Sequence, residues 1–174
     1  MWRTFIPAVL ALGLFVSAPQ LSAQQDFVPA GTLLRCTLDE PYLSPRNAEV
    51  GDPVLCKLNG VQRIGSVAFP RGSYLGGHIE AQKELGNFGT RGRMKLVFDR
   101  IAWPNGAVDA NSKVIAVKNY VVDHDGTIVG GWLNDPVLRG ETPVTVRLMD
   151  DVEVPAMLVS YGAGWHFFGE SNRR

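Results

Sequence analysis

The sequence has 174 residues, and its 17 Lys and Arg side chains balance 17 Asp and Glu side chains, so its formal net charge at pH 7 is zero. A chain without excess charge lacks the electrostatic field that recruits nucleic acid or anionic lipid. The length suits one domain with a single hydrophobic core. The sequence therefore predicts a one-domain protein that does not bind nucleic acid.

Residues 1–23 have the pattern of a secretory signal peptide. Arg3 precedes an apolar run of 14 residues (5–18), and the small residues Ser22 and Ala23 end the segment. A membrane anchor is the alternative, but a helix needs about 20 apolar residues to span a bilayer, so we expect cleavage after Ala23. The remaining 151 residues carry 16 basic and 17 acidic side chains. We therefore expect a bacterial protein in the periplasm or secreted, and not an integral membrane protein after cleavage.

Apolar and polar residues alternate in most of the remaining sequence, which is the two-residue period of half-buried strands. The alternation is cleanest over residues 32–38, 53–58, 75–81 and 144–148. Pro- and Gly-rich turns separate these stretches, and we find no long helical period after the signal. The predicted fold class is all-β, a single small β-barrel or sandwich, with little helix outside the signal peptide. We expect the β-domain to span 24–153 and an aromatic, Gly-containing tail to span 154–174.

Two local patterns predict how the sheet bends and closes. Gly76 and Gly77 leave room for another backbone to come close. The apolar phase switches within 93–103, which predicts a β-bulge near Asp99 and Arg100, anchored by an ion pair between these two residues. The strands expected at 32–38 and 144–148 are near copies of one another, so we expect them to meet as edges that close the sheet.

The two cysteines, Cys36 and Cys56, lie on the apolar phase of their own strands. Both sulfur atoms therefore face the same core, and export places the chain in an oxidising compartment. Two buried free thiols are the alternative. We predict a disulfide that closes a 20-residue loop and stabilises the fold by about 3 kcal/mol in the chain-entropy model.

Four residues are candidates for metal or catalytic chemistry. His78 and Glu80 share the outward phase of one strand, so they form a possible ligand pair or a general base with its orienting group. Asp123 and His124 lie in an Asp-His-Asp-Gly stretch that is typical of a turn. A solvated strand face and an ordinary turn explain the same residues, so we favour no metal, no cofactor and no catalytic residue.

The tail contains several large apolar side chains separated by glycines. They are Met157, Tyr161, Trp165, Phe167 and Phe168. Exposed apolar segments of this kind mark sites of protein association, and an added strand is the alternative. The sequence predicts partner binding through this tail.

Four short motifs together resemble one protein family. They are Val28–Leu33, Pro70–Gly77, Phe98–Gly106 and Gly140–Val152. In this order they are similar to the C-terminal β-barrel domain of TrbI-type proteins, the channel-forming components of conjugation and type IV secretion machines, and to small exported relatives of that domain. The resemblance implies a barrel and partners among secretion-system components. Family members insert a helical pair that crosses the outer membrane, and 126–138 is too short for it, so we expect a barrel without the pore.

These observations predict a non-enzymatic, exported β-domain that binds or assembles with other envelope proteins, with edge-strand addition as the mode of docking. A metal-dependent or hydrolytic periplasmic enzyme that uses His78, Glu80, Asp123 and His124 is the first alternative. A self-assembling structural subunit, which forms a homo-oligomer, is the second.

Overall fold

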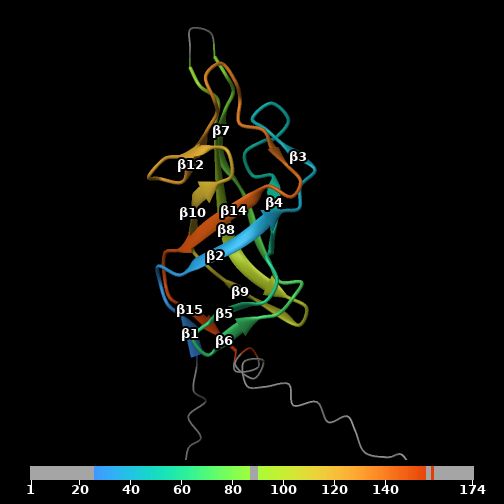
Figure 1. Cartoon of the computed structure of the whole chain (residues 1–174), viewed down its shortest axis with the longest axis vertical. Helices are drawn as coiled ribbons and strands as arrows, with labels where there is room; N and C mark the ends of the chain where they lie inside the picture. Colours follow the sequence, from blue (N-terminus) through green and yellow to red (C-terminus); the bar gives the residue numbers. More distant parts are fainter. Residues whose placement is uncertain (1–25, 87–89, 156–157, 159–174) are drawn as a thin grey trace, which may run out of the picture.

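The computed structural model describes residues 26–86, 90–155 and 158 (Figure 1). Every element defined in this part of the chain is a strand, so the all-β prediction is confirmed. The strands are β1 (Asp26–Val28), β2 (Leu33–Leu38), β3 (Tyr42–Leu43), β4 (Pro53–Leu58), β5 (Gln62–Ile64), β6 (Val67–Phe69), β7 (Tyr74–Lys83), β8 (Arg93–Trp103), β9 (Gly106–Asp109), β10 (Ser112–Val117), β11 (Val121–Val122), β12 (Thr127–Val129), β13 (Leu138–Arg139), β14 (Pro143–Leu148) and β15 (Val152–Val154). None of the described residues belongs to a helix that is long and apolar enough to cross a membrane.

The main sheet is antiparallel and has the order β10-β14-β2-β4-β7-β8-β12-β11, with β9 also paired to β8. Its two ends come together, because Val117 of β10 forms a bridge with Tyr120 just before β11. The Ser112 hydroxyl at the start of β10 also donates to the Phe98 carbonyl of β8, at 2.5 Å. The sheet is therefore a nearly closed barrel.

Three small two-stranded sheets lie at the ends of the barrel: β1-β15, β5-β6 and β3-β13. Figure 1 shows β1, β15, β5 and β6 together at one end, and β3, β12 and the tip of β7 toward the other. Val154 ends β15 and is buried, so regular structure continues one residue past the expected boundary at 153. The expected signal peptide lies outside the described residues.

The barrel interior is filled by the apolar phase of its strands. In β2 and β4 the side chains of Leu34, Cys36, Val54 and Cys56 have no exposed surface. The disulfide between Cys36 and Cys56 is confirmed, with 5.5 Å between the Cα atoms. It joins two neighbouring strands, because Cys36 lies opposite Leu58 in the β2-β4 register. The covalent link thus adds to a pairing that hydrogen bonds and burial already favour.

The predicted bulge in β8 is confirmed. The register passes from Gly76 opposite Arg100 to Gly77 opposite Phe98, which leaves Asp99 as the extra residue. A Cβ atom on Gly77 would collide with the backbone of β8, so the expected close approach occurs there. A second bulge interrupts the register between Ile79 and Ala81 of β7.

The predicted ion pair between Asp99 and Arg100 is wrong. Asp99 Oδ2 contacts His78 Nδ1 at 3.1 Å, whereas Arg100 Nε lies 3.7 Å from Asp109 Oδ1. Successive strand residues point toward different neighbours, and the bulge directs Asp99 toward β7 and Arg100 toward β9. The bulge is therefore anchored by two cross-strand contacts instead of one local pair.

The two near-copy strands do meet, but they do not close the sheet. β14 pairs with β2 from Pro143 to Arg147, with Val144 opposite Cys36 and Val146 opposite Leu34. This pair lies inside the sheet, and the ends that meet belong to β10 and to the segment before β11. Alternation predicted that the two strands share a face, but it does not determine their place in the sheet order.

Candidate functional site

His78 and Glu80 do not converge on a common ligand. His78 contacts Asp99, while Glu80 Oε2 lies 2.6 Å from Lys95 Nζ and its hydrogen bond raises the pKa of the lysine. The bulge between Ile79 and Ala81 falls at Glu80, so each side chain has its own partner on β8. Within the described ranges no three His, Cys, Asp or Glu side chains form a group that could hold a metal ion.

Asp123 and His124 lie in the predicted turn. Gly126 closes it, because its amide donates to the Asp123 carbonyl at 2.9 Å and its φ is +91°. The Asp125 carboxylate accepts hydrogen bonds from the amide and hydroxyl of Thr127, and these bonds lower its pKa from the ordinary value of an aspartate. The His124 carbonyl accepts a hydrogen bond from Lys113. These contacts are the ones that a turn needs, and they bring no metal ligands together.

The partner-binding residues predicted in the tail, from Met157 to Phe168, lie outside the described residues. Leu158 is the described residue of this stretch, and it is buried in the core. Its amide donates to the Pro155 carbonyl at 3.0 Å. The tail therefore contacts the core at Leu158.

The structure shows a surface that the sequence interpretation missed, on the loop between β12 and β13. We call residues 130–137 the end loop. Trp132 is 69% exposed and Leu133 is 60% exposed. Leu133 also has a φ of +64°, a region that bulky residues rarely adopt. Two large apolar side chains are thus presented to solvent, one of them on strained backbone.

A buried carboxylate holds the end loop in place. The Asp135 side chain is only 5% exposed, and its Oδ2 lies 2.6 Å from Arg46 Nε. Its Oδ1 accepts a hydrogen bond from the Leu85 amide at 2.6 Å. The hydrogen bond to Asp135 raises the pKa of the Arg46 guanidinium. One side chain therefore joins the end loop to two other segments, one before β4 and one after β7.

Further contacts hold both ends of the loop. The Gly130 amide donates to the Gly92 carbonyl at 2.9 Å, and a Cβ atom on Gly92 would collide with Asp135. The Tyr120 hydroxyl donates to the Val137 carbonyl at 2.6 Å and accepts from the Val137 amide at 3.0 Å. These hydrogen bonds hold the backbone at the two ends of the loop and leave the two apolar side chains exposed. The end loop is consequently ordered before any partner arrives.

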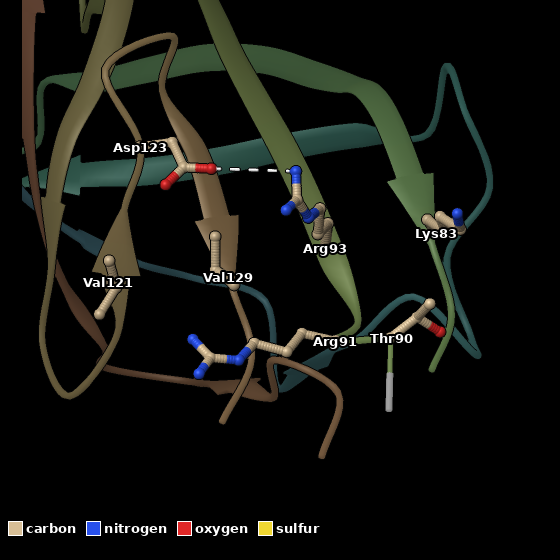
Figure 2. Close-up of a pocket in the computed structure, with 7 residues that line it drawn as sticks. All are labelled: Lys83, Thr90, Arg91, Arg93, Val121, Asp123 and Val129. Carbon is tan, nitrogen blue, oxygen red and sulfur yellow. Dashed lines mark ion pairs between the residues drawn. The ribbon is translucent and has the colours of Figure 1, made fainter. Parts of the chain in front are cut away.

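A cationic hollow of about 500 Å³ lies beside the end loop (Figure 2). Its walls come from the β7-β8 ribbon and the β11-β12 hairpin. The lining residues are Lys83, Thr90, Arg91, Arg93, Val121, Asp123 and Val129. The Arg91 guanidinium lies over the Trp132 ring, 5.6 Å from its centroid. The hollow and the end loop therefore form one continuous surface, which we call the end surface.

A sequence signal for this surface was present. Gly130 and Gly131 precede Trp132 and Leu133, and Asn134 to Pro136 follow, so a large apolar pair lies inside a turn-rich segment. Such a segment is exposed as a rule, and large exposed apolar side chains often mark contact sites. The interpretation considered only whether this segment was helical.

No protein-family model and no curated protein matches the chain. Among solved structures, the chain is similar to ComB10 of the Com type IV secretion system of Helicobacter pylori, with a TM-score of 0.47 and 12% identity over 74% of this chain and 91% of that chain. Because the TM-score and the identity are low, we draw no function from it.

Proposed function

We propose that this chain is an exported, periplasmic β-domain that acts by binding a protein partner in the cell envelope through its end surface. The observation that carries the proposal is the exposure of Trp132 and Leu133 on a loop that is fixed by the buried Asp135. More specifically, we expect this partner to be a secretion-system component, because the sequence motifs resemble those of TrbI-type proteins.

The energetics of association favour such a surface. Binding loses free energy when flexible side chains and loops become ordered, and a loop that is already held avoids much of this loss. Tryptophan is enriched among the residues that contribute most to protein interfaces, and charged side chains are typical of the rim. Trp132 is exposed on the end surface, with the charged Arg91 over its ring. The end surface thus combines an apolar anchor with a polar border.

Export is supported by two features of the chain. Residues 1–23 have the signal-peptide pattern, and the Cys36–Cys56 disulfide is of the kind that persists in oxidising compartments. The disulfide lies in the core, where it stabilises a small barrel outside the cytosol.

A pull-down from solubilised cell envelope tests the proposal. The bait is the mature chain from residue 24, compared with the double variant Trp132→Ala, Leu133→Gly, in which glycine relieves the positive φ. The matched control is Phe27→Ala, because Phe27 is 57% exposed at the opposite end of the barrel. We expect a specific envelope protein on the wild type and on the control, and its loss on the double variant. Light scattering on each bait separates partner capture from self-association.

A bait that ends at Leu158 tests the tail. Because Leu158 is buried, this version keeps the core contacts of that residue. Loss of the partner from this bait, with full retention by the double variant, would assign docking to the tail and contradict the proposal.

A further inference from the structure

We infer that the cationic hollow binds carboxylate groups on an acidic segment of the partner, so that the partner must present acidic side chains next to apolar ones. This inference rests on the proposed function and adds the chemistry of the partner. It is carried by the placement of Lys83, Arg91 and Arg93 around one hollow.

Two of the three cations face each other across a strand pair. Lys83 lies directly opposite Arg93 in the β7-β8 register. Residues in this position have Cβ atoms about 5 Å apart, and like charges there repel and destabilise the sheet. An anion between the two side chains would remove this repulsion. A sheet that keeps such a pair at an open hollow has the electrostatics of an anion site.

The hollow contains too little negative charge of its own to balance these cations. Asp123 Oδ2 lies 4.0 Å from the nearest Arg93 nitrogen, and both side chains are partly exposed (Figure 2). An exposed pair at this distance contributes little. In the described part of the chain this is the one ion pair that Lys83, Arg91 and Arg93 form. The lining therefore has three cations and one carboxylate, a net charge of two positive units.

Arg91 is held at the hollow by an aromatic neighbour. Its guanidinium carbon lies over the Trp132 ring, 5.6 Å from the ring centroid, and the attraction between cation and ring favours this position beside the hollow. A planar guanidinium fits a carboxylate through two parallel hydrogen bonds. Gly92 is buried between Arg91 and Arg93, and a Cβ atom at this position would collide with Asp135, so the end loop packs closely against the backbone that carries both arginines.

The neighbouring apolar surface favours a protein segment over a small free anion. Val121 is exposed on one wall of the hollow, and the exposed Trp132 ring lies beside Arg91, which lines it. A chain that places an acidic side chain in the hollow also covers these apolar groups, whereas a free phosphate leaves them in water. The positive charge of the hollow and the exposed apolar groups beside it thus both favour a protein segment that carries acidic and apolar side chains.

Hexaglutamate, acetylated and amidated at its ends, is a direct probe, and hexaglutamine is its neutral match. Amide chemical shifts of labelled mature protein at low ionic strength report where each peptide binds. We expect saturable shifts at Lys83, at 91–93 and at the Trp132 indole N–H with hexaglutamate alone. In the variant Arg91→Gln, Arg93→Gln we expect binding about tenfold weaker or lost.

The control variant is Arg35→Gln, Arg147→Gln, which removes two exposed cations from the outer face of β2 and β14. We expect it to bind hexaglutamate as the wild type does. The inference is contradicted if hexaglutamine gives the same shifts, if the shifts map to Arg35 and Arg147, if no saturable shift occurs at millimolar peptide, or if inorganic phosphate binds as tightly as hexaglutamate.

The same variants separate this inference from the proposed function. If Arg91→Gln, Arg93→Gln still captures the envelope partner while Trp132→Ala, Leu133→Gly does not, docking through the end loop stands and the acidic specificity fails. If neither variant loses the partner, the proposed function itself fails.

Discussion

The two ends of the barrel use tryptophan in opposite ways. At the end that β1 and β15 cover, Trp103 is buried and its ring centroid lies 6.5 Å from that of Phe69. At the other end, Trp132 is exposed on the end loop with Arg91 over its ring. One end is closed by packing, and the other presents apolar surface to solvent. Exposure at the second end is therefore a property of that loop and not of a poorly covered core.

Different forces hold the two ends. At the closed end, strand pairing places Val28 opposite Val152, and both side chains are buried. At the end of the barrel that carries the end loop, this loop is held by hydrogen bonds of Asp135 and Tyr120. Core truncation should therefore affect global stability, whereas changes in the loop should affect local order and binding.

The largest effect is expected at the closed end. Phe69→Ala removes a fully buried ring that packs beside Trp103, and truncations of this kind lower the free energy of unfolding by about 3–5 kcal/mol. Denaturant unfolding of the mature protein measures it. A loss of less than about 1 kcal/mol would mean that this end is loosely packed and would remove the contrast between the ends.

Asp135→Ala should give the next largest effect. The change leaves the partly buried Leu85 amide without its acceptor, and an unsatisfied buried donor costs about 1–3 kcal/mol, whereas the exposed Arg46 returns to water. We also expect faster hydrogen exchange at the amides of Leu85 and Gly130. Asp135→Asn is the control, since it keeps one acceptor oxygen and should retain part of the protection. Unchanged hydrogen exchange at these amides in both variants would show that Asp135 does not hold the end loop.

Tyr120→Phe tests the second attachment of the loop. It removes the hydroxyl that both accepts from and donates to Val137, and at about 0.5–1.5 kcal/mol for each hydrogen bond the two together contribute about 1–3 kcal/mol. We expect a loss of stability within this range and faster exchange at the Val137 amide. Wild-type exchange at Val137 would indicate that the rest of the loop holds this residue without the tyrosine.

Trp132→Ala should have the smallest effect on stability. Substitution of an exposed side chain changes the free energy of unfolding by less than about 0.5 kcal/mol. Denaturant unfolding beside Phe69→Ala gives the comparison. A large loss for Trp132→Ala would show that this tryptophan supports the fold, and it would remove the reason to regard it as a binding residue.

Local features of the fold were predictable from the sequence, and long-range ones were not. The bounds of β4 and β8 and the bulge at Asp99 were predicted, because alternation and a phase switch are properties of a short stretch. The pairing of β1 with β15 joins the two ends of the domain, and no periodicity encodes it. The disulfide was predictable because both cysteines lie on apolar phases, whereas the sheet order around them was not.

The candidate site was less predictable than the fold. His78 and Glu80 share a phase in the sequence, but each contacts a different residue of β8 beside a bulge. The end loop depends on Asp135, which contacts Arg46 and Leu85 far away in the sequence. A site built from such contacts gives no compact motif, because the residues that hold it are not neighbours in the chain.

Site-specific photo-crosslinking tests the central claim most directly. A photoreactive phenylalanine derivative replaces Trp132 in one version of the full chain and Phe27 in another, so that both exposed aromatic positions carry the same probe. Illumination of cells that produce each version, followed by mass spectrometry, identifies what lies next to each end of the barrel. The account predicts a discrete envelope protein crosslinked from position 132 and none from position 27. Crosslinks from position 27 alone, or the same products from both positions, would contradict it.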